Sequence, residues 1–241
     1  MRIVQGGLRM ASGPLAGGVI LLLLAHLDVL GPLPFAPLVR DYAAMLPRML
    51  YLVLGSALLA LGSIILFMFR DPRRGIGKGI VSPADGVVRF VHYIRGGVHI
   101  SIFLGLHNVH VVRAPIYGSV KRIVRHRGPH RPAFLEGSSS NERISVHMNT
   151  PGGEVRVIMI AGAFARRIVP YIRRGDILKK GEKIGFIRFG SRVDIILPTS
   201  FEPNVMQGSR VRAATDTIAV ESRTPGKEGN FGDAWVIPRR R

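Results

Sequence analysis

Gly190 and Ser191 lie between two strand-like apolar runs within residues 183–198. A serine hydroxyl in this position can attack the carbonyl group that precedes it, because glycine has no Cβ and tolerates strained backbone geometry. Such an attack would cleave the chain before Ser191 and could leave an electrophile at the new chain end. A Gly-Ser pair is also a common turn, so its meaning depends on the other reactive residues of the chain.

Two further groups of residues could assist a serine hydroxyl. Asp85 follows Ser82-Pro-Ala and precedes Gly86, at the start of a strand-like run. His107 and His110 form His-Asn-Val-His, in which strand geometry would separate the two imidazoles and a turn would bring them together. Taken singly, these are a turn aspartate and two surface histidines, and a metal site is poorly supported because no third ligand lies nearby in sequence. Together they supply a base for the hydroxyl proton and a carboxylate to orient that base.

A serine hydrolase is one interpretation of this Asp, His and Ser set. The Gly-x-Ser-x-Gly pattern of a nucleophile elbow is absent around Ser191, however, and no helix is expected after it. The chain has no cysteine, which excludes disulfides, thiolate metal sites and a cysteine nucleophile.

The charge balance favours a polyanionic partner, because 34 Lys and Arg residues face 15 Asp and Glu residues and give a net charge of +19. That partner is either nucleic acid or an anionic membrane surface. The mean hydropathy of +0.24 is high for a soluble nucleic-acid-binding protein. Aromatic residues make up only 7% of the chain, so few rings are available to stack on bases. We therefore expect a membrane as partner and no nucleic acid.

Residues 49–69 carry no charge and would form a helix about 31 Å long, which matches the hydrocarbon core of a bilayer. A second apolar run ends near residue 30, where a signal-peptide core or an interfacial segment is the alternative to a span. We expect a hairpin of two transmembrane helices, at about residues 13–30 and 49–69. Small residues spaced seven apart could seat one helix on the other: Gly55, Ser56, Gly62 and Ser63.

Arg70, Arg73, Arg74 and Lys78 directly follow the second span, so the positive-inside rule places the rest of the chain in the cytoplasm. The expected location is therefore the cell membrane, with the folded domain on its cytoplasmic face.

Beyond residue 79, short Val- and Ile-rich runs alternate with turn signals, which predicts a mainly β domain. Residues 163–172 are expected to add one or two helical turns. The chain then divides into a membrane anchor (1–70), a β domain (71–221) and a polar basic tail (222–241). The expected strands cover residues 86–94, 98–104, 109–113, 119–124, 143–149 and 154–160.

The order of these motifs resembles the phosphatidylserine decarboxylase family in its short proenzyme form. Longer members carry Leu-Gly-Ser-Thr at the cleavage site, whereas this chain keeps the Gly-Ser core within Phe-Gly-Ser-Arg. The resemblance covers residues 69–198. Its matching segments are Phe69-Arg-Asp-Pro-Arg73, Ser82-Pro-Ala-Asp-Gly-Val87, His107-Asn-Val-His110 with Arg113-Ala-Pro115, Asn141-Glu-Arg143, Ala165-Arg-Arg-Ile168, Gly181-Glu182 and Phe189-Gly-Ser-Arg-Val-Asp194.

The resemblance implies a compact, mainly β domain with biotinyl/lipoyl-like hairpins that cleaves itself between Gly190 and Ser191. Ser191 would become a pyruvoyl group, and no metal is expected. His110 would be the base for cleavage, Asp85 its orienting partner and His107 the acid during turnover. The pyruvoyl group would form a Schiff base with phosphatidylserine or archaetidylserine, and loss of CO₂ would give phosphatidylethanolamine or its ether-linked counterpart.

The implied partners are an anionic aminophospholipid, the membrane, and two chains of one cleaved precursor, β (1–190) and α (from residue 191). A further homo-oligomer is left open. The alternative is a membrane-anchored adaptor or binding domain without catalysis, because residues 175–182 resemble a biotinyl/lipoyl-like hairpin. That segment lacks the modifiable lysine between hydrophobic residues that carriers of this kind have.

Overall fold

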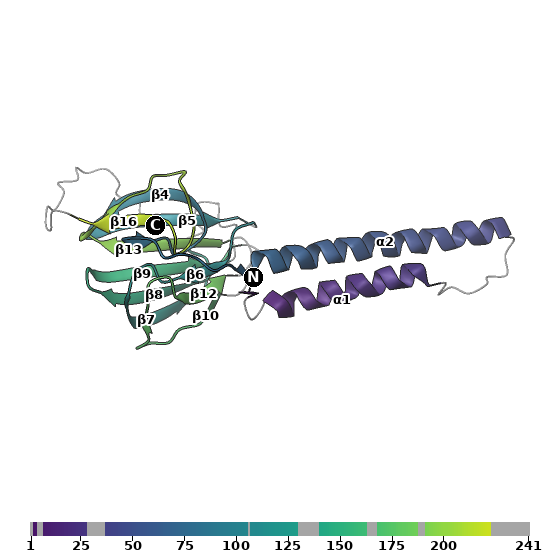
Figure 1. Cartoon of the computed structure of the whole chain (residues 1–241), viewed down its shortest axis with the longest axis horizontal. Helices are drawn as coiled ribbons and strands as arrows, with labels where there is room; N and C mark the ends of the chain where they lie inside the picture. Colours follow the sequence, from purple (N-terminus) through teal and green to yellow (C-terminus); the bar gives the residue numbers. More distant parts are fainter. Residues whose placement is uncertain are drawn as a thin grey trace, which may run out of the picture.

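A computed structural model describes residues 2–3, 7–27, 37–105, 107–129, 140–162, 168–187 and 191–222. Two long helices, α1 (Gly7–His26) and α2 (Pro37–Met68), lie side by side and project from one end of a β domain (Figure 1). The predicted mainly β class and the N-terminal pair of apolar helices are confirmed. The tail from residue 223 onward, predicted to be polar and basic, lies outside the described residues.

Both helices have the length and composition of membrane spans. Their apolar windows are Gly7–His26 and Met45–Met68, and only 17% of each window is buried within the protein. A core helix of a soluble protein would bury most of its apolar side chains, whereas these project outward as a lipid environment requires. The helices begin at Gly7 and Pro37, earlier than the expected starts near residues 13 and 49.

Glycines allow α1 and α2 to approach each other closely. A Cβ atom at Gly18 would lie 2.9 Å from the carbonyl oxygen of Gly55, and one at Gly62 would lie 2.6 Å from Cγ of Leu15. Gly55 and Gly62 therefore form the predicted seat for the other helix, because no larger residue fits at this distance. Ser56 and Ser63, predicted to share that face, are exposed.

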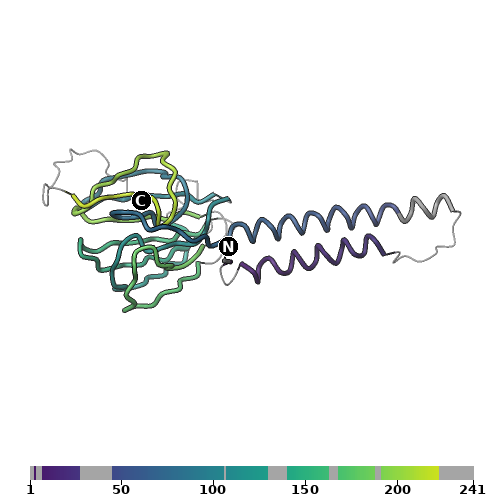
Figure 2. Tube along the Cα trace, in the orientation of Figure 1, coloured from purple at the N-terminus to yellow at the C-terminus, as the bar shows by residue number. Residues whose placement is uncertain are grey.

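The β domain is built from antiparallel strands in one large sheet and two small ones. Figure 2 traces its backbone at one end of the helix pair. The large sheet has the order β11 (Ile177–Leu178), β7 (Gly118–His126), β8 (Arg143–Thr150), β9 (Gly153–Ile160), β13 (Ser191–Pro198), β5 (Gly97–Leu104), β4 (Gly86–Ile94) and β15 (Arg210–Val211). The small sheets are β10 (Ile168–Pro170), β12 (Lys183–Ile187) and β6 (Val111–Arg113), and β14 (Phe201–Pro203), β16 (Thr217–Glu221) and β3 (Ile80–Val81).

Alternation along the strands places the core on one face of the large sheet. In β5, Val98, Ile100, Ile102 and Leu104 are buried in the core, and the residues between them face the other side. The predicted hairpin between β8 and β9 is present. Residues 168–170 form strand β10, not the helical turn expected there, because they pair with β12; residues 163–167 lie outside the described part of the chain.

The helix pair is packed onto the β domain through a second apolar cluster. Ala11 of α1 and Ile65 and Phe69 at the end of α2 contact Val109 and Phe186 of the β domain. The short strand β1 (Arg2–Ile3) also pairs with β2 (Arg70–Asp71), directly after α2. The base of the helix pair is thus part of the folded domain.

The glycine contacts predict that Gly18→Val separates the helices, because the added side chain would overlap Leu59 and the backbone of Gly55. We expect the yield of a disulfide introduced between α1 and α2 to fall several-fold, which is measurable because the chain has no cysteine of its own. Gly13→Val is the matched control, since nothing lies within 4 Å of a Cβ there. Equal yields for the two variants would contradict this packing.

Candidate active site

Ser191 is the first residue of β13 and is fully buried. It pairs with Leu104, the last residue of β5. Its Oγ atom has no hydrogen-bond partner among the described residues. A buried hydroxyl without a partner is costly and uncommon, which marks Ser191 as a candidate reactive group. Gly190, the other half of the predicted cleavage site, lies outside the described residues.

The segment after β5 forms a tight turn closed by Asn108. The Asn108 amide donates to the carbonyl oxygen of Gly105 at 3.0 Å, and Asn108 Oδ1 accepts from the Gly105 amide at 2.9 Å. The turn leaves His107 exposed and buries His110. The two imidazoles nevertheless interact electrostatically, since the charge of His107 contributes to lowering the pKa of His110.

His110 is held as a neutral base. Burial lowers the pKa of His110 to about 4, and the charges of Arg70 and His107 act in the same direction. Nδ1 lies 2.9 Å from the carbonyl oxygen of Asn108, so Nδ1 carries the proton and Nε2 keeps its lone pair. Nε2 is buried and has no hydrogen-bond partner in the described part of the chain. It can therefore accept a proton at neutral pH.

The two ends of the predicted cleavage segment meet the turn that carries the histidines. On one side, the amide of Ile187, the last residue of β12, donates to the carbonyl oxygen of His110 at 3.2 Å. On the other side, Ser191 pairs with Leu104, immediately before that turn. Segments far apart in sequence are in this way brought to one end of the large sheet.

Asp85 directly precedes β4 and is buried. Its Oδ2 accepts from Arg74 Nη2 at 2.7 Å, and its Oδ1 accepts from the amide of Ala213 at 2.8 Å. The negative charge of Asp85 favours the protonated form of His110, so the two groups lie in one electrostatic cluster. The hydrogen bond that orients His110 runs from its Nδ1 to the carbonyl oxygen of Asn108, a residue that the sequence pattern did not single out.

Asp194, three residues after Ser191 in β13, faces the side of the large sheet opposite to Ser191. It accepts from Ser101 at 2.7 Å and from Arg192 at 2.9 Å, and its Oδ2 lies 3.1 Å from His99 Nε2. Because side chains alternate along a strand, Ser191 and Asp194 point to opposite faces. Asp194 is therefore not the carboxylate that could assist Ser191.

A second ion-pair cluster, around Asp71, connects β2, β6 and β12. Asp71 of β2 is buried and bonds Arg113 of β6, and its Oδ2 accepts from Lys183 of β12 at 2.7 Å. Arg113 also donates to the carbonyl oxygen of Gly181 at 2.8 Å. The Asp71 cluster thus links the segment after α2 to β6, which follows the histidine turn, and to β12, which pairs with β6. The sequence contained these residues within its motifs, but nothing in the local pattern indicated that they pair.

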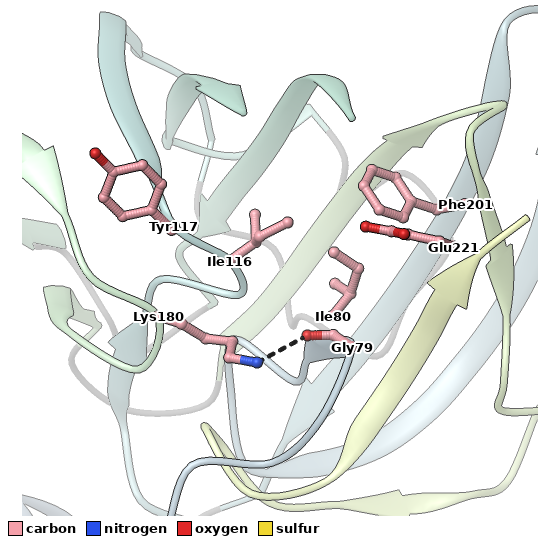
Figure 3. Close-up of a pocket in the computed structure, with 7 residues that line it drawn as sticks. All are labelled: Gly79, Ile80, Ile116, Tyr117, Lys180, Phe201 and Glu221. Carbon is pink, nitrogen blue, oxygen red and sulfur yellow. Dashed lines mark hydrogen bonds between the residues drawn. The ribbon is translucent and has the colours of Figure 1, made fainter. Parts of the chain in front are cut away.

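A pocket of about 460 Å³ opens elsewhere in the β domain (Figure 3). Ile80 and Phe201 contribute apolar side chains to its lining, and Glu221 lies beside Phe201. Lys180 donates to the carbonyl oxygen of Gly79 at 3.3 Å. None of the four predicted catalytic residues lines it. Among the described residues no cluster of His, Asp and Glu side chains could hold a metal ion.

Comparison with known proteins identifies relatives over most of the β domain. A family model described as phosphatidylserine decarboxylase matches residues 61–219, which include Asp85, His107, His110 and Ser191. A phosphatidylserine decarboxylase proenzyme of Streptomyces coelicolor is 45% identical over 161 residues, which cover 66% of this chain and 74% of the relative.

Two further relatives come from different organisms. A phosphatidylserine decarboxylase proenzyme of Thermobifida fusca is 46% identical over 162 residues, which cover 66% of this chain and 75% of the relative. A protein of Halobacterium salinarum, provisionally named an archaetidylserine decarboxylase proenzyme, is 41% identical over 165 residues, 66% of this chain and 82% of the relative.

The Asp71 cluster predicts that Arg113→Gln strongly destabilises the β domain, because it removes the main partner of a buried carboxylate. We expect a loss of about 3 kcal/mol in the free energy of unfolding. Lys121→Gln, which breaks the exposed pair with Glu154, is the control and should cost less than about 1 kcal/mol. Chemical denaturation of both variants measures the difference, and similar losses would show that Asp71 does not depend on Arg113.

Proposed function

Because the chain belongs to the phosphatidylserine decarboxylase family and is therefore a decarboxylase, we propose that it removes CO₂ from phosphatidylserine or archaetidylserine by means of a pyruvoyl group made from Ser191. The names of its relatives support either lipid as the substrate. The Streptomyces coelicolor relative is named for phosphatidylserine, and the Halobacterium salinarum relative is named for archaetidylserine. They are also named proenzymes, which supports activation by cleavage.

The observation that carries the proposal is a pair of buried polar atoms without hydrogen-bond partners among the described residues. These are Oγ of Ser191 and Nε2 of His110. A folded protein rarely leaves such atoms unsatisfied unless they are used in chemistry. One is a nucleophile and the other a neutral base, and both adjoin the same turn.

Self-cleavage would begin when Ser191 Oγ bonds to the carbonyl carbon of Gly190 and gives its proton to His110 Nε2. The bond from that carbon to the Ser191 nitrogen then breaks, the nitrogen takes up a proton, and an ester remains. Loss of the Ser191 Cα proton expels the Gly190 carboxylate and leaves dehydroalanine. Water replaces the nitrogen of dehydroalanine, which leaves as ammonia, and the product is a pyruvoyl group.

Such a group supplies a ketone that binds the amine of the lipid and takes up the electron pair left behind by CO₂. The fit of the surrounding residues supports it: the position is buried, and His110 is neutral there. His107, exposed on the same turn, would return a proton to the product. Asp85 would act on His110 through its charge.

The product would be two chains, β (1–190) and α (from 191), that remain together. β13 lies between β9 and β5 in the large sheet, so the α chain would keep its ladder of hydrogen bonds on both sides. We assign residues 1–70 to the membrane anchor, 71–221 to the catalytic domain and 222–241 to a tail. The two apolar helices would cross the cell membrane and hold the domain on its cytoplasmic face, where the lipid head group lies.

The proposal predicts that the full chain runs as two fragments on a denaturing gel, with a new end at residue 191. Ser191→Ala should run as one chain, and Ser119→Ala, a substitution in β7 away from the site, should cleave as the parent does. Mass spectrometry of the smaller fragment should find a pyruvoyl group in place of serine. A full-length parent chain would contradict the proposal and favour an adaptor without catalysis.

Separate roles for the two histidines predict separate defects. His110→Ala should slow self-cleavage by about 100-fold or more, because a general base is lost. His107→Ala should leave cleavage intact and lower CO₂ release from lipid vesicles. His126→Ala, at an exposed position, is the control. The reverse pattern of defects would show that the roles are exchanged.

The pKa of His110 predicts the pH dependence of self-cleavage. The base acts in its neutral form, and a pKa of about 4 keeps it neutral down to roughly pH 5. The cleavage rate should therefore be nearly constant from pH 7.5 to 5.5 and fall as the pH approaches 4. Rates measured on freshly synthesised chain test this, and a fall centred near pH 6.5 would show that His110 titrates as an ordinary histidine.

A further inference from the structure

Arg70, the second residue after α2, makes two backbone contacts that join the helix to the histidine turn. Its Nη1 donates to the carbonyl oxygen of Phe67 at 2.6 Å, and its Nη2 donates to the carbonyl oxygen of His107 at 2.9 Å. The guanidinium also lies 3.7 Å from the centre of the Phe67 ring. Only a planar, forked donor can serve both carbonyl groups in this way while stacking on a ring.

The end of α2 also contacts the histidine turn directly. Met68 has a carbonyl group that the helix itself cannot satisfy, and it accepts from the amide of His110 at 3.4 Å. Val109 and Val111, on either side of His110, belong to the apolar cluster that includes Phe69. The position of His110 therefore depends on where the helix ends.

Arg74 forms an ion pair with Asp85, the carboxylate of the site. Its Nη2 lies 2.7 Å from Asp85 Oδ2, and both side chains are nearly buried, 12% and 9% exposed. Arg73, between Arg70 and Arg74, is exposed. Two of the three arginines that follow the span thus bond groups of the candidate site, although the positive-inside rule would be satisfied by arginines in solvent.

The charge of Arg70 affects the pKa of His110, the proposed base. The charged groups that act on His110 are Arg70, Asp85 and His107. Partial burial lowers the pKa of Arg70, and the charges of Asp85 and Arg74 act on it in opposite directions. Arg70, Arg74, Asp85 and the two histidines are therefore one electrostatic unit, to which the segment after the helix contributes both cations.

We propose that Arg70 and Arg74 are positioning residues of the active site, Arg70 for the turn of His107 and His110 and Arg74 for Asp85. This inference rests on the proposed function and extends it, because it gives the segment at the end of α2 a part in positioning the histidine turn. The helix pair then has a second role beside anchoring, since it determines the geometry of the base.

Three charge-conserving variants test the proposal: Arg70→Lys, Arg74→Lys and Arg73→Lys. All three keep the charge at the membrane surface, and lysine cannot donate in a fork. In full-length chains synthesised into lipid vesicles, we expect Arg70→Lys and Arg74→Lys to cleave roughly tenfold or more slowly, because small misplacements of reacting groups are costly. Arg73→Lys should match the parent. Protease resistance of the β domain, equal in all three, separates misplacement from misfolding.

A pH profile distinguishes positioning of the base from a general loss of stability. Arg70→Gln removes a charge that lowers the pKa of His110, so the acid limb of its cleavage profile should move to higher pH. Arg70→Lys keeps the charge and should leave the limb in place while lowering the plateau rate. Arg73→Gln should change neither quantity.

The outcomes separate this inference from the function on which it rests. If the parent chain and Ser191→Ala both stay uncut, the proposed function fails. If the parent cleaves and all three lysine variants cleave at its rate, the positioning roles are refuted and the proposed function stands. Slow cleavage in Arg73→Lys as well would refute the positioning roles too, since an exposed neighbour would then matter as much.

Discussion

The register between β5 and β13 determines where the candidate active site forms. The two strands pair along their whole length, from Ser191 with Leu104 to Pro198 with Gly97. A slip by one residue would turn Ser191 to the opposite face of the sheet and bring Arg192 into the core. The buried apolar residues of both strands prevent that slip. The hydroxyl is thus held next to the histidine turn by packing along the whole strand pair.

Electrostatics then set the state of the groups that the register brings together. Burial keeps His110 neutral, and the Asn108 carbonyl group selects the tautomer that leaves Nε2 free of its proton. Asp85 is ionically paired with Arg74, so its charge is compensated within the site. The base, the hydroxyl and the carboxylate can all be buried because each carries little uncompensated charge.

The sequence predicted much of the fold because β alternation and turn chemistry are local. The expected strand at residues 86–94 coincides with β4, and the turn between β8 and β9 lies at the predicted Thr150–Gly153. The helical turn expected at residues 163–172 was wrong for residues 168–170. Their pairing with β12 is a contact between distant segments, which local composition does not reveal.

The candidate site was predictable by residue type and less so by contact. Asp85, His107, His110 and Ser191 stood out because their chemistry is rare in such a pattern. The partners of these residues did not stand out, because an arginine that pairs inward has the same local pattern as one that sets topology. Arg70 and Arg74 bond groups of the candidate site, and Arg73 is exposed. Only the folded chain distinguishes the first two from the third.

The pairing of β1 with β2 constrains how the two helices can run. β1 precedes α1 and β2 follows α2, so the ladder can form only because α2 returns to the end of the pair at which α1 begins. Were a bilayer crossed an odd number of times between them, the two strands would lie on opposite sides of it and could not exchange hydrogen bonds. The β1–β2 ladder is therefore compatible only with an even number of crossings.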